Sequence, residues 1–157
     1  MPISLADALD LSKALLTPLI ALVATYIAWQ QWKANQLKLK LDRYDRRLKV
    51  YEEVQRILGI ILRDAKASYE DLLNFRTAVA QADFLFGPEI GEFIDHIYQR
   101  GVKLRYWTEQ YRDYTQEMPA GYDHQKVTDG MQTELTWLAE QFDPAKQKFK
   151  PYLQISD

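Results

Sequence analysis

The chain has 157 residues, of which 47% are hydrophobic, 13% are aromatic and 27% are charged. This composition predicts a folded protein and excludes a disordered or low-complexity one. Because the sequence has no cysteine, disulfide bonds, thiol chemistry, iron–sulfur clusters and cysteine-ligated zinc are excluded.

The net charge of -2 conceals an uneven distribution along the chain. Residues 33–49 carry seven Lys/Arg and two Asp, whereas the chain from Val50 onward carries 12 Lys/Arg and 18 Asp/Glu. A basic segment beside an acidic body indicates that something negative, such as an anionic lipid leaflet, lies next to the basic segment. The negative charge of the body disfavours binding to nucleic acid. The expected lipid-facing residues are Trp29, Trp32, Lys33, Lys38, Lys40, Arg43, Arg46, Arg47 and Lys49.

The first predicted element is a transmembrane helix over residues 14–32. These 19 residues carry no charge and, as a helix, span about 28 Å, close to the thickness of a bilayer core. Tyr26, Trp29 and Trp32 gather at the end of the segment, where aromatic rings favour the head-group layer. The alternatives are a cleaved signal peptide, disfavoured by Asp7 and Asp10 and by the lack of a small-residue cleavage site, and a buried core helix.

The basic residues also predict an orientation. Seven Lys/Arg follow the expected span and only Lys13 precedes it, so the positive-inside rule places the C-terminal domain in the cytoplasm. We therefore expect a single-pass protein of the bacterial inner membrane, with residues 1–13 as a short periplasmic N-terminus.

The next predicted element is a long helical stalk. No Gly or Pro occurs from Leu19 to Leu58, which favours one helix that leaves the membrane, passes through the basic segment 33–49 and continues to about Ala80. A narrow apolar seam with spacings of four and three residues predicts self-association as a coiled coil through Leu37, Leu41, Tyr44 and Leu48. A second apolar row, expected to face a core, consists of Val50, Val54, Ile57 and Ile61.

The rest of the chain predicts a cytoplasmic helical bundle over residues 50–157. Gly87-Pro88 starts a helix expected to run to Tyr114, and a turn follows at 118–122. Asp123 is the expected cap of a third helix, and Asp143-Pro144 starts or kinks a short final one. The predicted fold is all-α: a transmembrane helix continuing into an antiparallel bundle of three long helices and a short C-terminal helix.

The segment that joins the span to the bundle carries a resemblance. WQQWKANQLKLKLD (29–42) followed by YDRRLKVYEEV (44–54) resembles the juxtamembrane region of small uncharacterised bacterial single-span membrane proteins. That group has an aromatic-Gln-Gln-Trp step, a Lys-rich stretch and a Phe/Tyr-Asp-Arg-Arg-x-x-x-Tyr-Glu motif. The resemblance implies a membrane helix and a stalk, and it implies no catalytic residue.

The sequence predicts no catalytic residue, cofactor or metal site. It has only two histidines, His96 and His124, and His124 is expected to be exposed at a helix start. Glu89, Glu92 and His96 could share one helix face, but no second motif of this kind completes a di-iron site. There is no Gly-rich phosphate loop and no H-E-x-x-H motif, so we do not expect an enzyme, although a hydrolase with a spatial triad stays open.

The remaining functional signal is a cluster of aromatic residues and arginines, the residue types that dominate binding hot spots. The candidate partner surface consists of Arg105, Tyr106, Trp107, Tyr111, Arg112, Tyr114 and Tyr122. Core packing is the alternative explanation of this cluster. The sequence therefore predicts a membrane-tethered interaction module, a scaffold, adaptor or regulatory subunit that binds a protein partner or itself. The alternative is a membrane-active effector whose spanning helices assemble in response to a signal.

Overall fold

The computed structural model describes the backbone of residues 5–154 and the side chains of Ala14, Leu16 and residues 18–154. The expected periplasmic segment 1–13 lies outside these residues except for its helical backbone from Leu5. The chain divides into two compact units, Met1–Asp42 and Arg43–Asp157, which are described separately.

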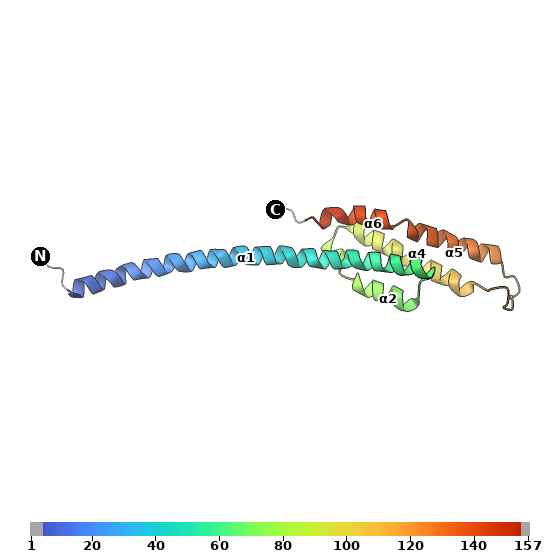
Figure 1. Ribbon diagram of the computed structural model, residues 1–157, viewed down its shortest axis with the longest axis horizontal. Helices are drawn as coiled ribbons and strands as arrows, with labels where there is room; N and C mark the ends of the chain where they lie inside the picture. The colour runs from blue at the N-terminus through green and yellow to red at the C-terminus, as the bar shows by residue number, and fades with distance from the viewer. Residues whose placement is uncertain (1–4, 155–157) are drawn as a thin grey trace. The chain divides into compact units, whose positions relative to one another are not determined.

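Every regular element of the described residues is a helix (Figure 1). The order is α1 (Leu5–Asp64), α2 (Tyr69–Ala78), α3 (Ala82–Leu85), α4 (Pro88–Gln110), α5 (His124–Ala139), α6 (Phe142–Phe149) and a 3-10 turn, η1 (Lys150–Tyr152). The prediction of an all-α protein is confirmed.

The first unit consists of the N-terminal part of α1. All of its side chains from Pro18 to Asp42 are exposed. Within the described residues, none of the helices combines the length and the apolar character that crossing a membrane requires. The side chains of Leu15 and Thr17, which belong to the expected span 14–32, lie outside the described residues. The predicted transmembrane helix is thus not confirmed.

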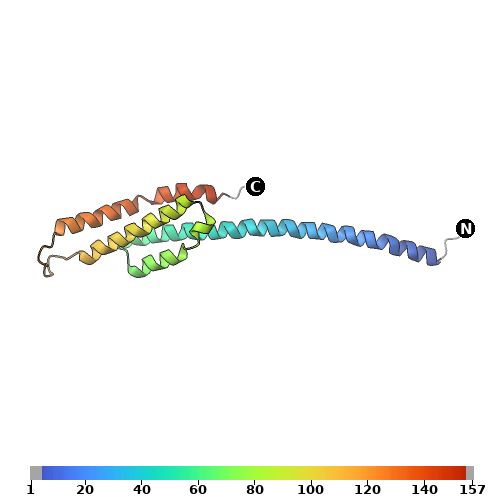
Figure 2. The same cartoon turned by 180° about the vertical axis from the view of Figure 1, so that it is seen from behind.

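The second unit is a helical bundle with one hydrophobic core. In two opposite views, α5 and α6 lie on one side of α4 and α2 lies on the other (Figures 1 and 2). The row Val50, Val54, Ile57 and Ile61 of α1 is fully buried in this core, as its spacing predicts. The main partners from the other helices are Leu72, Phe75, Ile90, Phe93, Ile94, Ile97, Leu104, Leu138, Ala145 and Phe149.

The prediction that the first long helix continues to about Ala80 is wrong. Helix α1 ends at Asp64, and Ala65 takes a φ of 51°, in the left-handed region. Ser68 then caps α2, because its hydroxyl oxygen accepts a hydrogen bond from the backbone N–H of Asp71 at 3.0 Å. Glu70 and Asp71 add favourable charge to the first turn. This cap lets α2 fold back on the bundle and pack against α4.

The loop before α5 is longer than expected. Helix α4 ends at Gln110 instead of Tyr114, since Asp113 forms a local turn in which its carboxylate accepts the Thr115 N–H at 2.7 Å. Asp123 caps α5 as predicted, accepting the Lys126 N–H at 3.0 Å. The final helix α6 begins at Phe142, one residue before the predicted Asp143.

Candidate functional site

Three tyrosine rings surround His124 at the start of α5. The centroids of Tyr111, Tyr114 and Tyr122 lie 5.6, 4.9 and 6.0 Å from the imidazole centroid. The Tyr122 hydroxyl also accepts the Arg112 backbone N–H at 3.0 Å and lies 3.4 Å from Nδ1 of His124. His124 is consequently half-buried, although the sequence suggests an exposed position. Loop 111–123 and His124 form what we call the aromatic end of the bundle.

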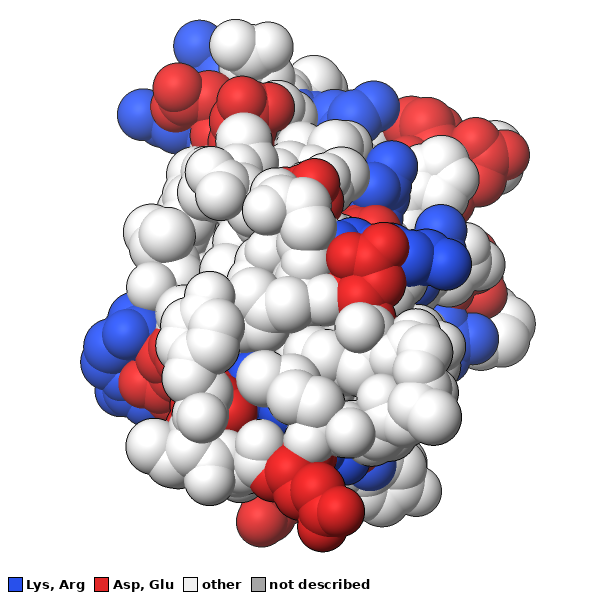
Figure 3. Space-filling model, turned by 90° about the vertical axis from the view of Figure 1, so that its right-hand side faces the viewer, with Lys and Arg blue, Asp and Glu red and all other residues white. Residues whose placement is uncertain are grey.

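The other aromatic members of the candidate surface divide between packing and exposure. Trp107 lies flat on α5, since a Cβ atom added to Gly130 would lie 2.5 Å from its indole ring. Tyr106 is exposed and packs its ring against Trp107, with centroids 5.1 Å apart. Trp107 is therefore half-buried against α5, whereas Tyr106, Tyr111 and Tyr114 present aromatic surface to the outside. Seen from this end, the middle of the molecule is largely uncharged (Figure 3).

Both arginines of the candidate surface are engaged within the chain. Arg105 pairs with Glu109 at 2.6 Å and lies over the ring of Tyr69, 4.9 Å from its centroid. Arg112 donates from Nη1 to the carbonyl oxygens of Glu109 and Tyr111, at 3.0 and 2.9 Å. The exposed tyrosines are thus the members of this set that remain most available to a partner.

Arg47 departs from the other residues expected to face lipid. Its Nε donates to the carbonyl oxygen of Leu85 at 3.0 Å, and its Nη1 donates to that of Tyr152 at 3.4 Å. The guanidinium also lies over the rings of Phe86 and Tyr152. Arg47 therefore points into the bundle, where it joins α1 to α3 and η1. The members that remain exposed are Trp29, Trp32, Lys33, Lys38, Lys40, Arg43, Arg46 and Lys49.

The contacts of Tyr152 are a feature that the sequence analysis missed. Its hydroxyl donates to the carboxylate of Glu89 and accepts the Gly87 N–H at 3.2 Å. The hydrogen bond from Tyr152 lowers the pKa of Glu89, and the same bond raises the pKa of Tyr152. Glu89 thereby holds the C-terminal turn against the start of α4.

The predicted self-association seam has two different environments. Leu37 and Leu41 are exposed, whereas Tyr44 and Leu48 are half-buried within the second unit. Only the first two are therefore fully available to a second helix.

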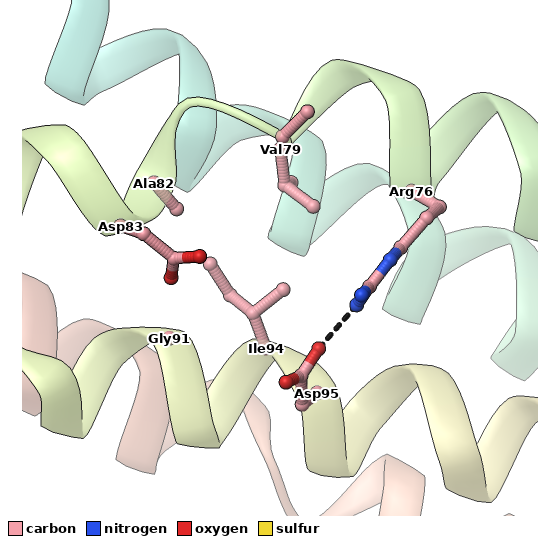
Figure 4. A pocket seen from close by; sticks show the side chains of 8 residues that line it. Arg76, Val79, Ala82, Asp83, Gly91, Ile94 and Asp95 are labelled. Atoms are coloured by element: carbon pink, nitrogen blue, oxygen red, sulfur yellow. Dashed lines mark hydrogen bonds and ion pairs between the residues drawn. The ribbon is translucent and has the colours of Figure 1, made fainter.

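A small pocket of about 170 Å³ lies between α2, α3 and α4 (Figure 4). Arg76 of α2 reaches across it to pair with Asp95 of α4, and Asp83 of α3 lies at its other end. Val79, Ala82 and Ile94 supply apolar walls. None of the residues that line the pocket is Ser, Thr, Cys, Tyr, His or Lys. Among the described residues, no group of three or more His, Cys, Asp or Glu side chains is placed to bind a metal ion.

No family model matches the chain, and the curated proteins and solved structures contain no match to it either.

Proposed function

We propose that the chain is a membrane-tethered helical interaction module of the bacterial inner membrane, with the bundle in the cytoplasm. The observation that carries this proposal is the exposure of a helix made largely of apolar residues. From Pro18 to Trp32 every side chain of α1 is exposed, including Leu19, Ile20, Leu22 and Ile27. Burying apolar surface is worth about 25 cal/mol per Å². A lipid phase would supply the burial that the chain does not provide.

The order of residue types along α1 favours lipid as the cover. The apolar residues come first, Trp29 and Trp32 follow, and Nζ of Lys33 lies over the Trp29 ring at 3.8 Å from its centroid. Aromatic rings suit the interface between hydrocarbon and water, and lysine suits the anionic head groups beyond it. The exposed basic residues that follow extend this contact, each contributing about 1 kcal/mol near an anionic leaflet.

Two exposed surfaces of the chain could contact a protein partner under this proposal. Leu37 and Leu41 are exposed one helical turn apart, which suits pairing with a second copy of α1. The exposed tyrosines of the aromatic end suit a different protein, because such rings bury a large area at a small cost in side-chain entropy. The effector alternative would need polar groups on the spanning helix. Among the described side chains of this segment, Thr25 Oγ1 is already bonded to the carbonyl oxygen of Ala21 at 2.8 Å, so Thr25 does not favour a pore.

The tether is tested by expressing the full chain in a bacterium with a C-terminal reporter that is active only in the periplasm. We expect the protein in the membrane fraction after a carbonate wash, with a silent reporter. The test variant replaces Leu19, Ile20 and Leu22 with Gln, and the control replaces Leu62, Tyr69 and Leu73 with Gln. We expect only the first variant to be released. Release of the unmodified chain would refute the tether, and periplasmic reporter activity would refute the orientation.

Self-association is tested separately by light scattering on the detergent-solubilised chain. Replacing Leu37 and Leu41 with Lys should convert an oligomer into a monomer, and replacing Leu62 and Leu73 with Lys should not. A monomeric unmodified chain would exclude pairing through these residues.

A further inference from the structure

We propose that the hollow between α4 and α5 is an anion site that binds a phosphorylated small molecule. The hollow has a volume of about 390 Å³ and is lined by His96, Gln99, Arg100 and Lys103 of α4 and by Trp137 of α5. The four α4 residues follow a spacing of three, one and three, so they lie on one face of the helix. None of the lining residues is acidic, although the chain from Val50 onward carries more acidic than basic residues.

Arg100 is held in position before any ligand arrives. Its Nη1 donates to Oε2 of Glu134 at 3.0 Å, and its guanidinium lies over the Trp137 ring at 5.0 Å from the centroid. Glu134 is buried, so its carboxylate holds the guanidinium without lining the hollow. A guanidinium has five N–H donors, and one bond to Glu134 leaves others for an oxyanion. A cation whose side chain is already ordered binds an anion with a smaller loss of entropy.

The remaining lining groups supply the charge and donors that an oxyanion needs. The Arg100–Glu134 pair is neutral overall, so the surplus positive charge comes from Lys103, which forms no ion pair among the described residues. Gln99 adds a neutral amide donor, and His96 adds a ring nitrogen at the rim. This set matches a phosphate group, which accepts several charge-assisted hydrogen bonds at once.

The nearby carboxylates point elsewhere or stand outside the hollow. Asp95 precedes His96 in the chain, but it pairs with Arg76 and lines the pocket on the other side of α4 (Figure 4). Glu92, one turn before His96, is exposed and does not line the hollow. Helix α4 therefore directs Asp95 toward α2 and Arg100 toward α5.

The test is isothermal titration calorimetry of the purified full chain with inorganic pyrophosphate at low salt. We expect saturable binding that weakens as salt is added. NMR should show a shift of the Trp137 indole N–H, identified by its absence in Trp137→Phe. Dihexanoyl phosphatidic acid, kept below its micellar concentration, forms a second arm. Binding of pyrophosphate assigns a soluble ligand, and binding of the lipid alone assigns a phosphorylated head group.

The decisive variant is Lys103→Glu, because Lys103 is exposed and is not a partner in the Arg100–Glu134 ion pair. We expect it to weaken binding about ten-fold or more, the loss of one charge-assisted contact. Lys66→Glu, an exposed lysine with the same change in net charge, should weaken binding less than about two-fold at physiological salt. Equal weakening by both variants, or the absence of saturable binding in both arms, would overturn the proposal. Circular dichroism of each variant checks that the bundle is still folded.

Discussion

The N-terminal and C-terminal parts of α1 have the same backbone conformation and opposite environments. Side chains from Pro18 to Arg43 are all exposed, whereas Val50, Val54 and Ile57 have no exposed surface. Helix formation and burial are therefore separate properties of this chain. The stretch from Leu19 to Leu58 has no Gly or Pro and is rich in helix formers, and it is helical both where its apolar residues are exposed and where they are buried. Substitutions in the two parts of α1 and in the bundle should therefore differ in their effect on stability.

The largest effect is expected from matched truncations in the two parts of α1. Ile57 is 0% exposed, and replacing it with Ala should lower the free energy of unfolding of the bundle by about 2–5 kcal/mol, since a cavity replaces its contacts. Leu39 is 59% exposed, and Leu39→Ala should change that free energy by less than about 0.5 kcal/mol. Urea unfolding followed by circular dichroism measures both. Similar losses for the two variants would mean that the N-terminal part is packed against the bundle.

Glycines offer a second comparison, between α5 and α1. Gly130→Ala should destabilise the bundle by about 1–3 kcal/mol, because the new methyl group would displace the Trp107 ring. Gly59 lies inside α1 with nothing within 4 Å of an added Cβ, so Gly59→Ala should stabilise by up to about 1 kcal/mol. Thermal unfolding of both variants checks that the first substitution lowers stability and the second raises it. A stable Gly130→Ala variant would mean that Trp107 is not needed to join α4 and α5.

The break between α1 and α2 is tested at its cap. Ser68→Ala removes the acceptor for the Asp71 N–H, and we expect a loss of about 1 kcal/mol in the free energy of unfolding. Ser68→Asp keeps an acceptor and should retain most of the stability. Should Ser68→Ala instead leave stability unchanged, the interpretation of the break as a capped helix start would be wrong. Urea unfolding at neutral pH is the measurement.

The smallest effect concerns the hydrogen bond between Tyr152 and Glu89. The lowered pKa of Glu89 means that its stabilisation is present above the carboxyl's ordinary pKa and is lost as the pH falls through the lowered value. The raised pKa of Tyr152 means that its contribution is present below the ordinary pKa of a phenol and is lost as the pH rises through the raised value. Tyr152→Phe should therefore be less stable than the unmodified chain near neutral pH.

This difference in stability should shrink toward both pH extremes. Protonation of Glu89 at low pH, or ionisation of Tyr152 at high pH, weakens the hydrogen bond in the unmodified chain, and Tyr152→Phe lacks that bond at every pH. The free energy of unfolding of both proteins, measured across the pH range, checks this expectation. A difference that does not change with pH would show that the Tyr152 hydroxyl contributes nothing through Glu89.

Several features of the bundle could be predicted because short-range chemistry decides them. The spacing of Val50, Val54, Ile57 and Ile61 places their side chains on one helix face, and that face is buried. Gly87-Pro88 starts α4 because proline suits the first helical position, and Asp123 caps α5 because its carboxylate reaches a free backbone N–H. In each case the physical cause lies within a few residues along the chain.

The end of α1 was mispredicted for a different reason. Neither Gly nor Pro marks the break, and Ala65 adopts a left-handed conformation that its side chain does not favour. Ser68 followed by Asp71 was the available local signal, but the apolar residues on both sides of the break matched a continuous helix. The packing of α2 on α4 stabilises the turn, and that contact joins residues far apart in the sequence.

Residue type and spacing alone predict the helical character of the chain, its core-facing row and the succession of apolar, aromatic and basic residues along α1. The use of individual charged and aromatic side chains depends instead on how the helices pack. Arg47 bonds to carbonyl oxygens of Leu85 and Tyr152, 38 and 105 positions away, and Arg100 bonds to Glu134, 34 positions away. Helical periodicity records which face a side chain occupies, and it carries no information about which distant group will meet that face once the helices have packed.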